Sequence, residues 1–274
     1  MANDLLKGKR GIITGALDQN SIAWKVAEKA HEQGATFVLT NAPIAMRMGE
    51  IKALAESTKS EIIPADATSI DELTNLFTKS TEILGGKIDF VLHSIGMSPN
   101  VRKNIPYMET NYDFYNKSMD VSAVSLHKML SVAHKLDAIS EGGSVVALSY
   151  IAAQRTYSFY NDMAEAKAML ESIVRSFGYH YGKSKKVRIN SVSQSPTKTT
   201  AGSGIKGFEE FYSFADAMSP LGNASAESCA DYCITLFSDL TRAVTMQNLF
   251  HDGGYSTTGA SAEAIEAFIK GTGK

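Results

Sequence analysis

The residues best suited to chemistry lie in the stretch LSYIAAQRTYSFYNDMAEAK, at positions 148–167. It contains Tyr150, Tyr157 and Tyr160 and ends on Lys167. If a helix opens at Tyr160, Lys167 follows two turns later and both side chains lie on one face. A nearby lysine favours the phenolate and lowers a phenol pKa that is about 10 when unperturbed. Such a phenol can donate a hydrogen bond or a proton to an oxygen on which negative charge develops.

Residue types alone favour a plainer interpretation of the same stretch. The three tyrosines would be aromatic packing, and Lys167 would be a surface residue whose stem is buried. The elements that carry these residues therefore decide between chemistry and packing.

Short β-rich runs alternate with helical patterns along the whole chain. The first helix, for example, places Ile22, Ala23, Val26, Ala27 and Ala30 at helical spacing and stops at Gly34. Strands that alternate with long helices indicate a parallel sheet covered on both faces. The sequence predicts an α/β fold, a single doubly wound Rossmann-type domain over residues 1–274 with about seven parallel strands. The expected strands are 11–14, 36–40, 61–64, 88–93, 144–149 and 187–192, and the later helices are 45–58, 69–84, 121–136, 160–181 and 226–238.

The first strand and helix suggest a nucleotide site. Gly15 follows the strand directly and the helix begins at about Ser21, so backbone N–H groups and the positive helix end can face a pyrophosphate. Gln19 and Ser21 occupy two positions where the usual dinucleotide fingerprint has glycine, so this signal is weak.

Three later strand ends add to this signal. Asp66 follows the third strand, where a carboxylate can contact adenine, although an acid before a helix is an equally good interpretation. HSIG, ending at Gly96, brings small residues where a backbone approaches a ligand. The second strand ends at Asn41 and Ala42 without the acid that usually contacts the NAD ribose. Arg47 could meet a 2′-phosphate but is more typical of a solvated helix residue.

Composition excludes several classes of partner. The formal charge of −2 and pI of about 6.3 give no basic surface for nucleic acid or an anionic membrane. The N-terminus lacks the apolar segment of a signal peptide, and no apolar run could cross a bilayer, so a cytoplasmic protein is expected. Cys229 and Cys233 are predicted to be helical core residues, and no metal site is predicted.

At these residues the chain resembles enoyl-acyl carrier protein reductases of bacterial fatty-acid synthesis, a divergent branch of the short-chain dehydrogenase/reductase superfamily. The similarity runs nearly end to end and is strongest in HSIGMSP, in LSY with its following tyrosine and lysine, in VRINSVSQSPTKTTAGSGI and in HDGGYS. The spacing Tyr-x₆-Lys discriminates, because ordinary short-chain dehydrogenases use Tyr-x₃-Lys and position 164 is alanine. Tyr179 with Lys183 and Tyr181 with Lys185 match the shorter spacing, but they lie at the polar end of the helix and are interpreted as surface charge and packing.

The resemblance implies specific roles. Tyr160 would hydrogen-bond the substrate thioester oxygen, Lys167 would hold the nicotinamide ribose, and Tyr150 would be the second active-site tyrosine beside the acyl chain. Ser98 falls at a substrate-contacting backbone position, and a mobile substrate-binding loop would span residues 195–218. The implied cofactor contacts are Gly15, Ser21, Ile22, Asp66, Ala67, Ile95, Lys167, Thr197, Lys198, Thr199, Thr200 and Ala201.

The resemblance also implies NADH as the cofactor, an enoyl thioester on acyl carrier protein as the substrate, and a homotetramer. Two departures bear on this: Ser195 stands where relatives commonly have glycine, and Ala42 stands where they have a glutamine near the ribose. Ala42 leaves NADPH as an alternative. The alternative functions are an ordinary short-chain ketone or alcohol dehydrogenase, and a dinucleotide-binding regulator without turnover.

Overall fold

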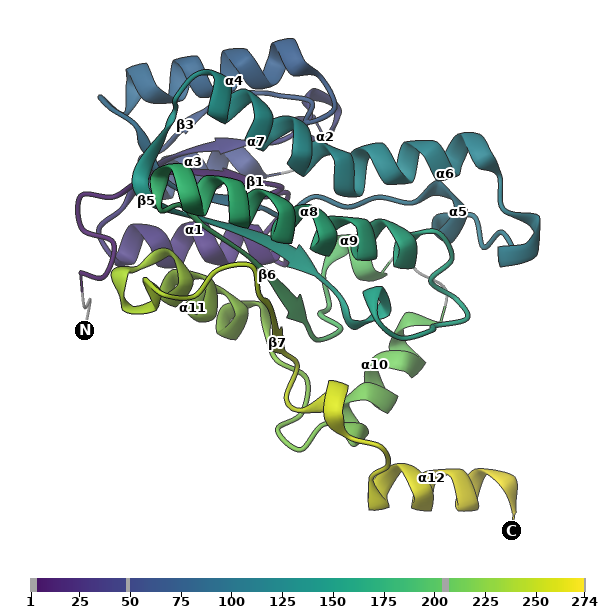
Figure 1. Cartoon of the computed structure of the whole chain (residues 1–274). Helices are drawn as coiled ribbons and strands as arrows, with labels where there is room; N and C mark the ends of the chain where they lie inside the picture. The colour runs from purple at the N-terminus through teal and green to yellow at the C-terminus, as the bar shows by residue number, and fades with distance from the viewer. Residues whose placement is uncertain (1–3, 48–49, 204–206, 274) are drawn as a thin grey trace.

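Within residues 4–47, 50–203 and 207–273, which this computed structural model describes, seven parallel strands form one sheet (Figure 1). Their order is β3-β2-β1-β4-β5-β6-β7. The doubly wound α/β prediction is therefore confirmed. The strands are β1 (Arg10–Thr14), β2 (Thr36–Thr40), β3 (Glu61–Ile62), β4 (Ile88–His93), β5 (Ile139–Ser149), β6 (Arg188–Gln194) and β7 (Asn248–His251).

Helices cover both faces of the sheet (Figure 1). One core lies against α1 (Ile22–Glu32), α3 (Ile51–Thr58) and α11 (Ala226–Phe237), and the other against α4 (Ile70–Ile83), α7 (Ser125–Lys135) and α8 (Met163–Lys185). Neighbouring strand residues alternate between these cores: Ile13 packs into the first and Ile12 into the second. Cys229 and Cys233 are free thiols fully buried in α11, as predicted.

The remaining elements gather toward the carboxyl ends of the strands. The segment before α7 is longer than expected, because a helix from Tyr112 continues through a π-helical turn, Asp120–Val124, into α7. The expected helix 45–58 is wrong as one element, since it is two helices, and residues 48–49 lie outside the described part. The other α-helices are α2 (Pro43–Met46), α5 (Pro99–Arg102), α6 (Tyr112–Met119), α9 (Thr200–Ser203), α10 (Phe208–Met218) and α12 (Ala262–Thr272).

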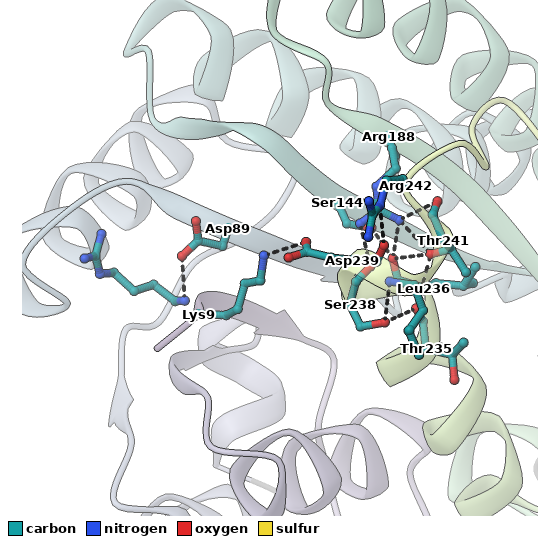
Figure 2. A network of polar contacts seen from close by, with 12 residues as sticks. Lys9, Asp89, Ser144, Arg188, Thr235, Leu236, Ser238, Asp239, Thr241 and Arg242 are labelled. Carbon is teal, nitrogen blue, oxygen red and sulfur yellow. Dashed lines mark hydrogen bonds and ion pairs between the residues drawn. The ribbon is translucent and has the colours of Figure 1, made fainter. Parts of the chain in front are cut away.

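A polar network closes the opposite, amino-terminal edge of the sheet (Figure 2). Arg188, at the start of β6, donates to the carbonyl oxygens of Leu236 at 2.7 Å and Ser238 at 3.0 Å. Ser144 of β5 donates to the same Leu236 carbonyl at 2.8 Å. Carbonyls at a helix end need such partners, so the guanidinium joins the end of α11 to the sheet. The described residues contain no helix with the length and apolarity needed to cross a membrane.

Candidate active site

The strand order reverses between β1 and β4, and Gly15 lies at this point. Its φ is +88°, and a Cβ added there would lie 1.9 Å from the carbonyl oxygen of Ser94, just after β4. The Ser94 amide in turn donates to Thr14 Oγ1 at 3.1 Å. Open α/β sheets bind ligands in the crevice at such a reversal. Glycine at position 15 lets the two strand ends approach closely.

The turn after Gly15 is ordered by its own side chains. Ser21 Oγ accepts hydrogen bonds from the amides of Leu17 at 3.2 Å and Asp18 at 3.1 Å. Ser21 is also the N-cap of α1, but its side chain caps none of the first helical amides. These amides and the helix dipole therefore favour an anion at this end. Thr200 in α9 donates to Asp18 Oδ2 at 2.5 Å, which brings the segment after β6 onto this turn.

Two of the predicted catalytic tyrosines lie together beyond the end of β5. The rings of Tyr150 and Tyr160 are 5.2 Å apart, and those of Tyr150 and Tyr157 are 5.6 Å apart. The hydroxyl of Tyr150 is buried and lacks a hydrogen-bond partner among the described residues. Tyr157 donates to the hydroxyl of Tyr255 at 3.0 Å, so HDGGYS contributes to the same aromatic cluster. An unpaired phenol beside a half-buried one suits binding of a polar ligand atom.

The prediction that Tyr160 opens the helix is wrong. Helix α8 begins at Met163, whose amide donates to the Tyr160 carbonyl at 3.1 Å. Asn161, between them, has a φ of +37°, which is not a right-handed helical conformation. Tyr160 therefore extends from a turn, so it does not share a helix face with Lys167.

Lys167 lies in the first turns of α8 and is only 6% exposed. Its Nζ donates to the Leu148 carbonyl of β5 at 2.8 Å. A Cβ added to Gly96 would lie 3.6 Å from this Nζ, which places the backbone after β4 directly over the lysine. Burial lowers the pKa of Lys167 to about 8, and the charge of Glu171 opposes that shift. The Tyr-x₆-Lys spacing thus places a buried amine at the crevice.

Lys167 does not lower the pKa of Tyr160, contrary to the prediction. Burial raises the pKa of Tyr160 to about 12. Tyr160 is therefore a protonated phenol at neutral pH, able to donate a hydrogen bond. Burial raises the pKa of Tyr150 as well, and the neighbouring tyrosines add to the shift.

The residues proposed for the adenine, Asp66 and Ala67, follow β3, and Ile95, proposed for the nicotinamide ribose, follows β4 at the same edge of the sheet. Asp66 Oδ1 accepts from the Thr68 amide at 2.8 Å and from Thr68 Oγ1 at 2.7 Å, so this carboxylate orders its own turn. Ala67 and Ile95 are half-buried. At the end of β2, Asn41 donates to the Ala16 carbonyl at 2.9 Å, which ties the second strand end to the first turn.

The segment after β6 differs from the long irregular loop that was expected. It contains α9 and α10, and residues 204–206 of the expected 195–218 loop lie outside the described part. Ser195 has no positive φ, and its Oγ accepts from the Ala224 amide at 3.0 Å. Lys198 Nζ pairs with Glu209 Oε2 at 2.7 Å, which directs this side chain along α10. Thr197 Oγ1 donates to the Ser195 carbonyl at 3.0 Å, so the segment begins as an ordered turn.

Sequence reasoning missed a buried carboxylate beneath Ser98. Asp162 is fully buried and accepts from Ser98 Oγ at 2.5 Å and from Asn100 Nδ2 at 2.8 Å. These bonds join the HSIGMSP segment to the turn that carries Tyr160. A charged residue between Tyr160 and the apolar start of α8 was the available signal, since Asp rarely lies inside without partners.

His93, at the end of β4, was also not expected to matter. Its Nε2 lies 2.9 Å from Ser125 Oγ, and its Nδ1 has no partner among the described residues. Burial, then the charge of Lys167, lowers the pKa of His93 to about 3. The histidine is therefore neutral at physiological pH.

We expect the stability of this protein to fall with acidification because of His93. Its folded pKa lies below the unfolded value of about 6.5, so the unfolded state binds the proton first as the pH falls through 6.5 toward 3. Between pH 7 and 5 this linkage costs about 2 kcal/mol of unfolding free energy. Urea unfolding of wild type and His93→Gln at both pH values measures it. An equal pH loss in the two proteins would contradict the assignment, and His134→Gln, an exposed histidine, is the control.

Comparison with known proteins agrees with this geometry over nearly the whole chain. Residues 15–256 match the family described as Enoyl-(Acyl carrier protein) reductase. The chain belongs to this family. A NADH-type enoyl-acyl-carrier-protein reductase, FabI, of Rickettsia bellii is 34% identical over 263 residues, which are 95% of this chain and 98% of that protein.

Solved structures of family members are equally similar. The FabI–NADH complex from Alistipes finegoldii is 62% identical with a TM-score of 0.95, covering 98% of this chain and 95% of that one. The Bacillus cereus reductase, crystallised with NADP⁺ and an indole naphthyridinone, is 30% identical with a TM-score of 0.87, covering 93% and 99%. The resemblance first seen in the sequence is thereby confirmed.

The residues at the reversal point fit a dinucleotide. An added Cβ at Gly15 or Gly96 would collide with Ser94 or Met163, so these glycines let the ends of β1 and β4 lie close to their neighbours, and the start of α1 offers uncapped amides for an anion. The two pairs with the shorter Tyr-x₃-Lys spacing, called decoy pairs here, are Tyr179 with Lys183 and Tyr181 with Lys185. They lie away from the site: Tyr179 is exposed, and Lys185 pairs with Asp137 at the other end of α8. They are packing and surface charge, as interpreted from the sequence.

Proposed function

We infer that this protein is an NADH-dependent enoyl-acyl-carrier-protein reductase of fatty-acid synthesis. The strongest support is the family match over residues 15–256. It is joined by the geometry of the site, in which the ring centroids of Tyr150 and Tyr160 are 5.2 Å apart. The reaction reduces the carbon–carbon double bond of a trans-2-enoyl thioester. Bound NADH would supply the hydride that reaches the β-carbon.

In this proposal Tyr160 donates a hydrogen bond to the thioester oxygen as negative charge builds on it. Its pKa of about 12 keeps the phenol protonated at neutral pH, so the donor is ready before the reaction. Donors aimed at developing charge in a dry site are among the largest sources of catalysis. Tyr150, whose hydroxyl has no hydrogen-bond partner among the described residues, would lie beside the acyl chain and limit access of water. The α-carbon takes its proton from solvent or a relay.

The cofactor would be held by two groups of residues. Lys167 would donate to the nicotinamide ribose, near Ile95. Gly15, Ser21 and Ile22 would lie along the pyrophosphate, with Asp66 and Ala67 at the adenine. The segment of Thr197, Lys198, Thr199, Thr200 and Ala201 would close over the nicotinamide and pyrophosphate, supported by the bond from Thr200 to Asp18.

We further propose that the substrate arrives on acyl carrier protein and contacts the backbone at Ser98. Residues 195–218 would form the substrate-binding loop of a single domain spanning 1–274. The active protein would be a cytoplasmic homotetramer. Gel filtration with light scattering measures the assembly, and a monomer at micromolar concentration would contradict it.

The proposed function is tested by following loss of reduced-nicotinamide absorbance with crotonyl thioester, using NADH and NADPH in parallel. Turnover with NADH that exceeds turnover with NADPH is expected, because the sequence of residues 41–50, after β2, contains a single basic residue, Arg47, and so no basic cluster for a 2′-phosphate. Bound NADH without turnover would instead favour a silent binding protein. Turnover only with a ketone substrate would favour an ordinary short-chain dehydrogenase.

A further inference from the structure

Glu171 is a buried carboxylate of α8 to which the proposed mechanism gives no role. It lies one helical turn beyond Lys167 and is 4% exposed. Its Oε1 accepts from Ser149 Oγ at 2.7 Å, and its Oε2 accepts from Gln154 Nε2 at 3.0 Å. A charge this deeply buried costs several kcal/mol unless it is paired or compensated. Its two partners are neutral donors, and the other acidic or basic side chain buried in α8 is Lys167.

Glu171 and Lys167 hold adjacent residues of the same strand end. Lys167 Nζ donates to the backbone carbonyl of Leu148 at 2.8 Å. Glu171 accepts a hydrogen bond from the side-chain hydroxyl of the next residue of β5, Ser149. Tyr150 follows immediately. The side chains of Lys167 and Glu171 thus form three hydrogen bonds, with Leu148, Ser149 and Gln154. Because both side chains belong to α8, these bonds fix their positions relative to each other and to Tyr150.

We propose that Glu171 is a positioning residue that keeps Lys167 charged and fixed at the cofactor ribose. This inference rests on the proposed function in one respect, the contact of Lys167 with the cofactor. Glu171 itself touches neither cofactor nor substrate in this scheme. It acts through the electrostatic field of its carboxylate at Lys167, and through its hydrogen bond with Ser149 at the end of β5.

The other groups that face Lys167 cannot replace this negative charge. His93, from β4, is neutral because its pKa is lowered to about 3. From β5 comes the dipole of the Leu148 carbonyl, and Tyr160 is a protonated phenol with a pKa of about 12. Burial lowers the pKa of Lys167, and the charge of Glu171 limits this shift, so that the pKa is about 8 with both effects present. Without it the amine would lose its proton nearer to neutral pH.

The test is the pH dependence of NADH binding and turnover in Glu171→Gln, which removes the charge but retains an oxygen for Ser149. In wild type, the NADH association constant and kcat/KM for NADH are expected to fall at alkaline pH, as Lys167 loses its proton. We expect this fall, the alkaline limb of the pH profile, to occur about one pH unit lower in Glu171→Gln. Glu165→Gln is the matched control: it lies on the same helix two residues from Lys167, and its carboxylate accepts from Tyr107. Its limb is expected to coincide with that of wild type.

If the pH profiles of a folded Glu171→Gln fall at the same alkaline pH as those of wild type, the proposal is overturned. A carboxylate with a purely structural role would change the affinity for NADH without changing the pKa of Lys167. Glu171→Asp, which keeps the charge, is expected to restore the wild-type limb. If Glu171→Gln does not fold, the double variant Lys167→Met/Glu171→Gln, which removes both charges, is expected to fold. Failure of both variants to fold would equally overturn the charge role.

The binding readout separates this inference from the proposed function. A protein that binds NADH without reducing crotonyl thioester would contradict the reductase assignment. The shift of the binding limb in Glu171→Gln would still be measured, and its presence or absence would decide the role of Glu171 alone.

Discussion

A Tyr160→Phe variant is expected to reduce kcat for crotonyl thioester by about 100- to 1000-fold, the usual effect of removing one donor to a developing oxyanion. An unperturbed phenol, with a pKa of about 10, is already protonated at neutral pH, and burial raises the pKa of Tyr160 further, to about 12. Phenylalanine keeps the ring that packs 5.2 Å from Tyr150, so the aromatic cluster remains filled. The affinity for NADH is expected to change little, because the hydroxyl acts on the thioester oxygen.

Steady-state kinetics with fluorescence titration of NADH measure both quantities. Tyr179→Phe is the matched control, since Tyr179 is an exposed tyrosine of α8 that belongs to one of the decoy pairs. It should retain wild-type kcat. A Tyr160→Phe enzyme with nearly full kcat would remove Tyr160 from the mechanism and direct attention to Tyr150.

A Gly15→Ala variant is expected to lose about 2–4 kcal/mol of unfolding free energy and to bind NADH at least about tenfold more weakly. The φ of +88° strains any side chain, and the new Cβ would lie 1.9 Å from the Ser94 carbonyl oxygen. Relief requires the ends of β1 and β4 to separate. Those ends form the crevice in which the cofactor is proposed to lie, so stability and binding should fall together.

Gly8→Ala separates strain from collision. Gly8 also has a positive φ, +74°, but an added Cβ would meet none of the described residues within 4 Å. Its cost should therefore be about 1 kcal/mol, from backbone conformation alone, with NADH affinity retained. Urea unfolding and NADH titration of both variants test this, and equal losses in the two would argue against close approach at Gly15.

Much of the fold could be predicted from local pattern. Strand β4 was placed at its observed bounds, and α11 and α4 were placed within one residue at each end, because their apolar residues have clear periods and their flanks have turn signals. Strand β7 was missed as an element: it is short and half-buried, and pairing with β6 rather than its own pattern makes it a strand. The start of α8 was misplaced because the pair Asn161–Asp162 was not used as a helix-start signal: Asn161 adopts a positive φ and Asp162 is the N-cap.

The site could be predicted only in part. Tyr150, Tyr160 and Lys167 were identified because their spacing resembles that of a family. Asp162 and Glu171 were missed because their importance comes from burial and from partners distant in the sequence, Ser98 at 64 positions and Ser149 at 22. The pKa of Tyr160 was predicted in the wrong direction, since spacing to Lys167 does not reveal desolvation.

The sequence by itself determined the α/β class, the order of most elements and the family, because hydrophobic period and short motifs are local properties of the chain. Only the tertiary structure decided which groups carry charge. Burial raises the pKa of Tyr160, keeps His93 neutral and lowers the pKa of Lys167 to about 8, and Glu171 opposes the last of these shifts. Desolvation and charge–charge distance depend on which strands and helices become neighbours, and that information belongs to the folded chain.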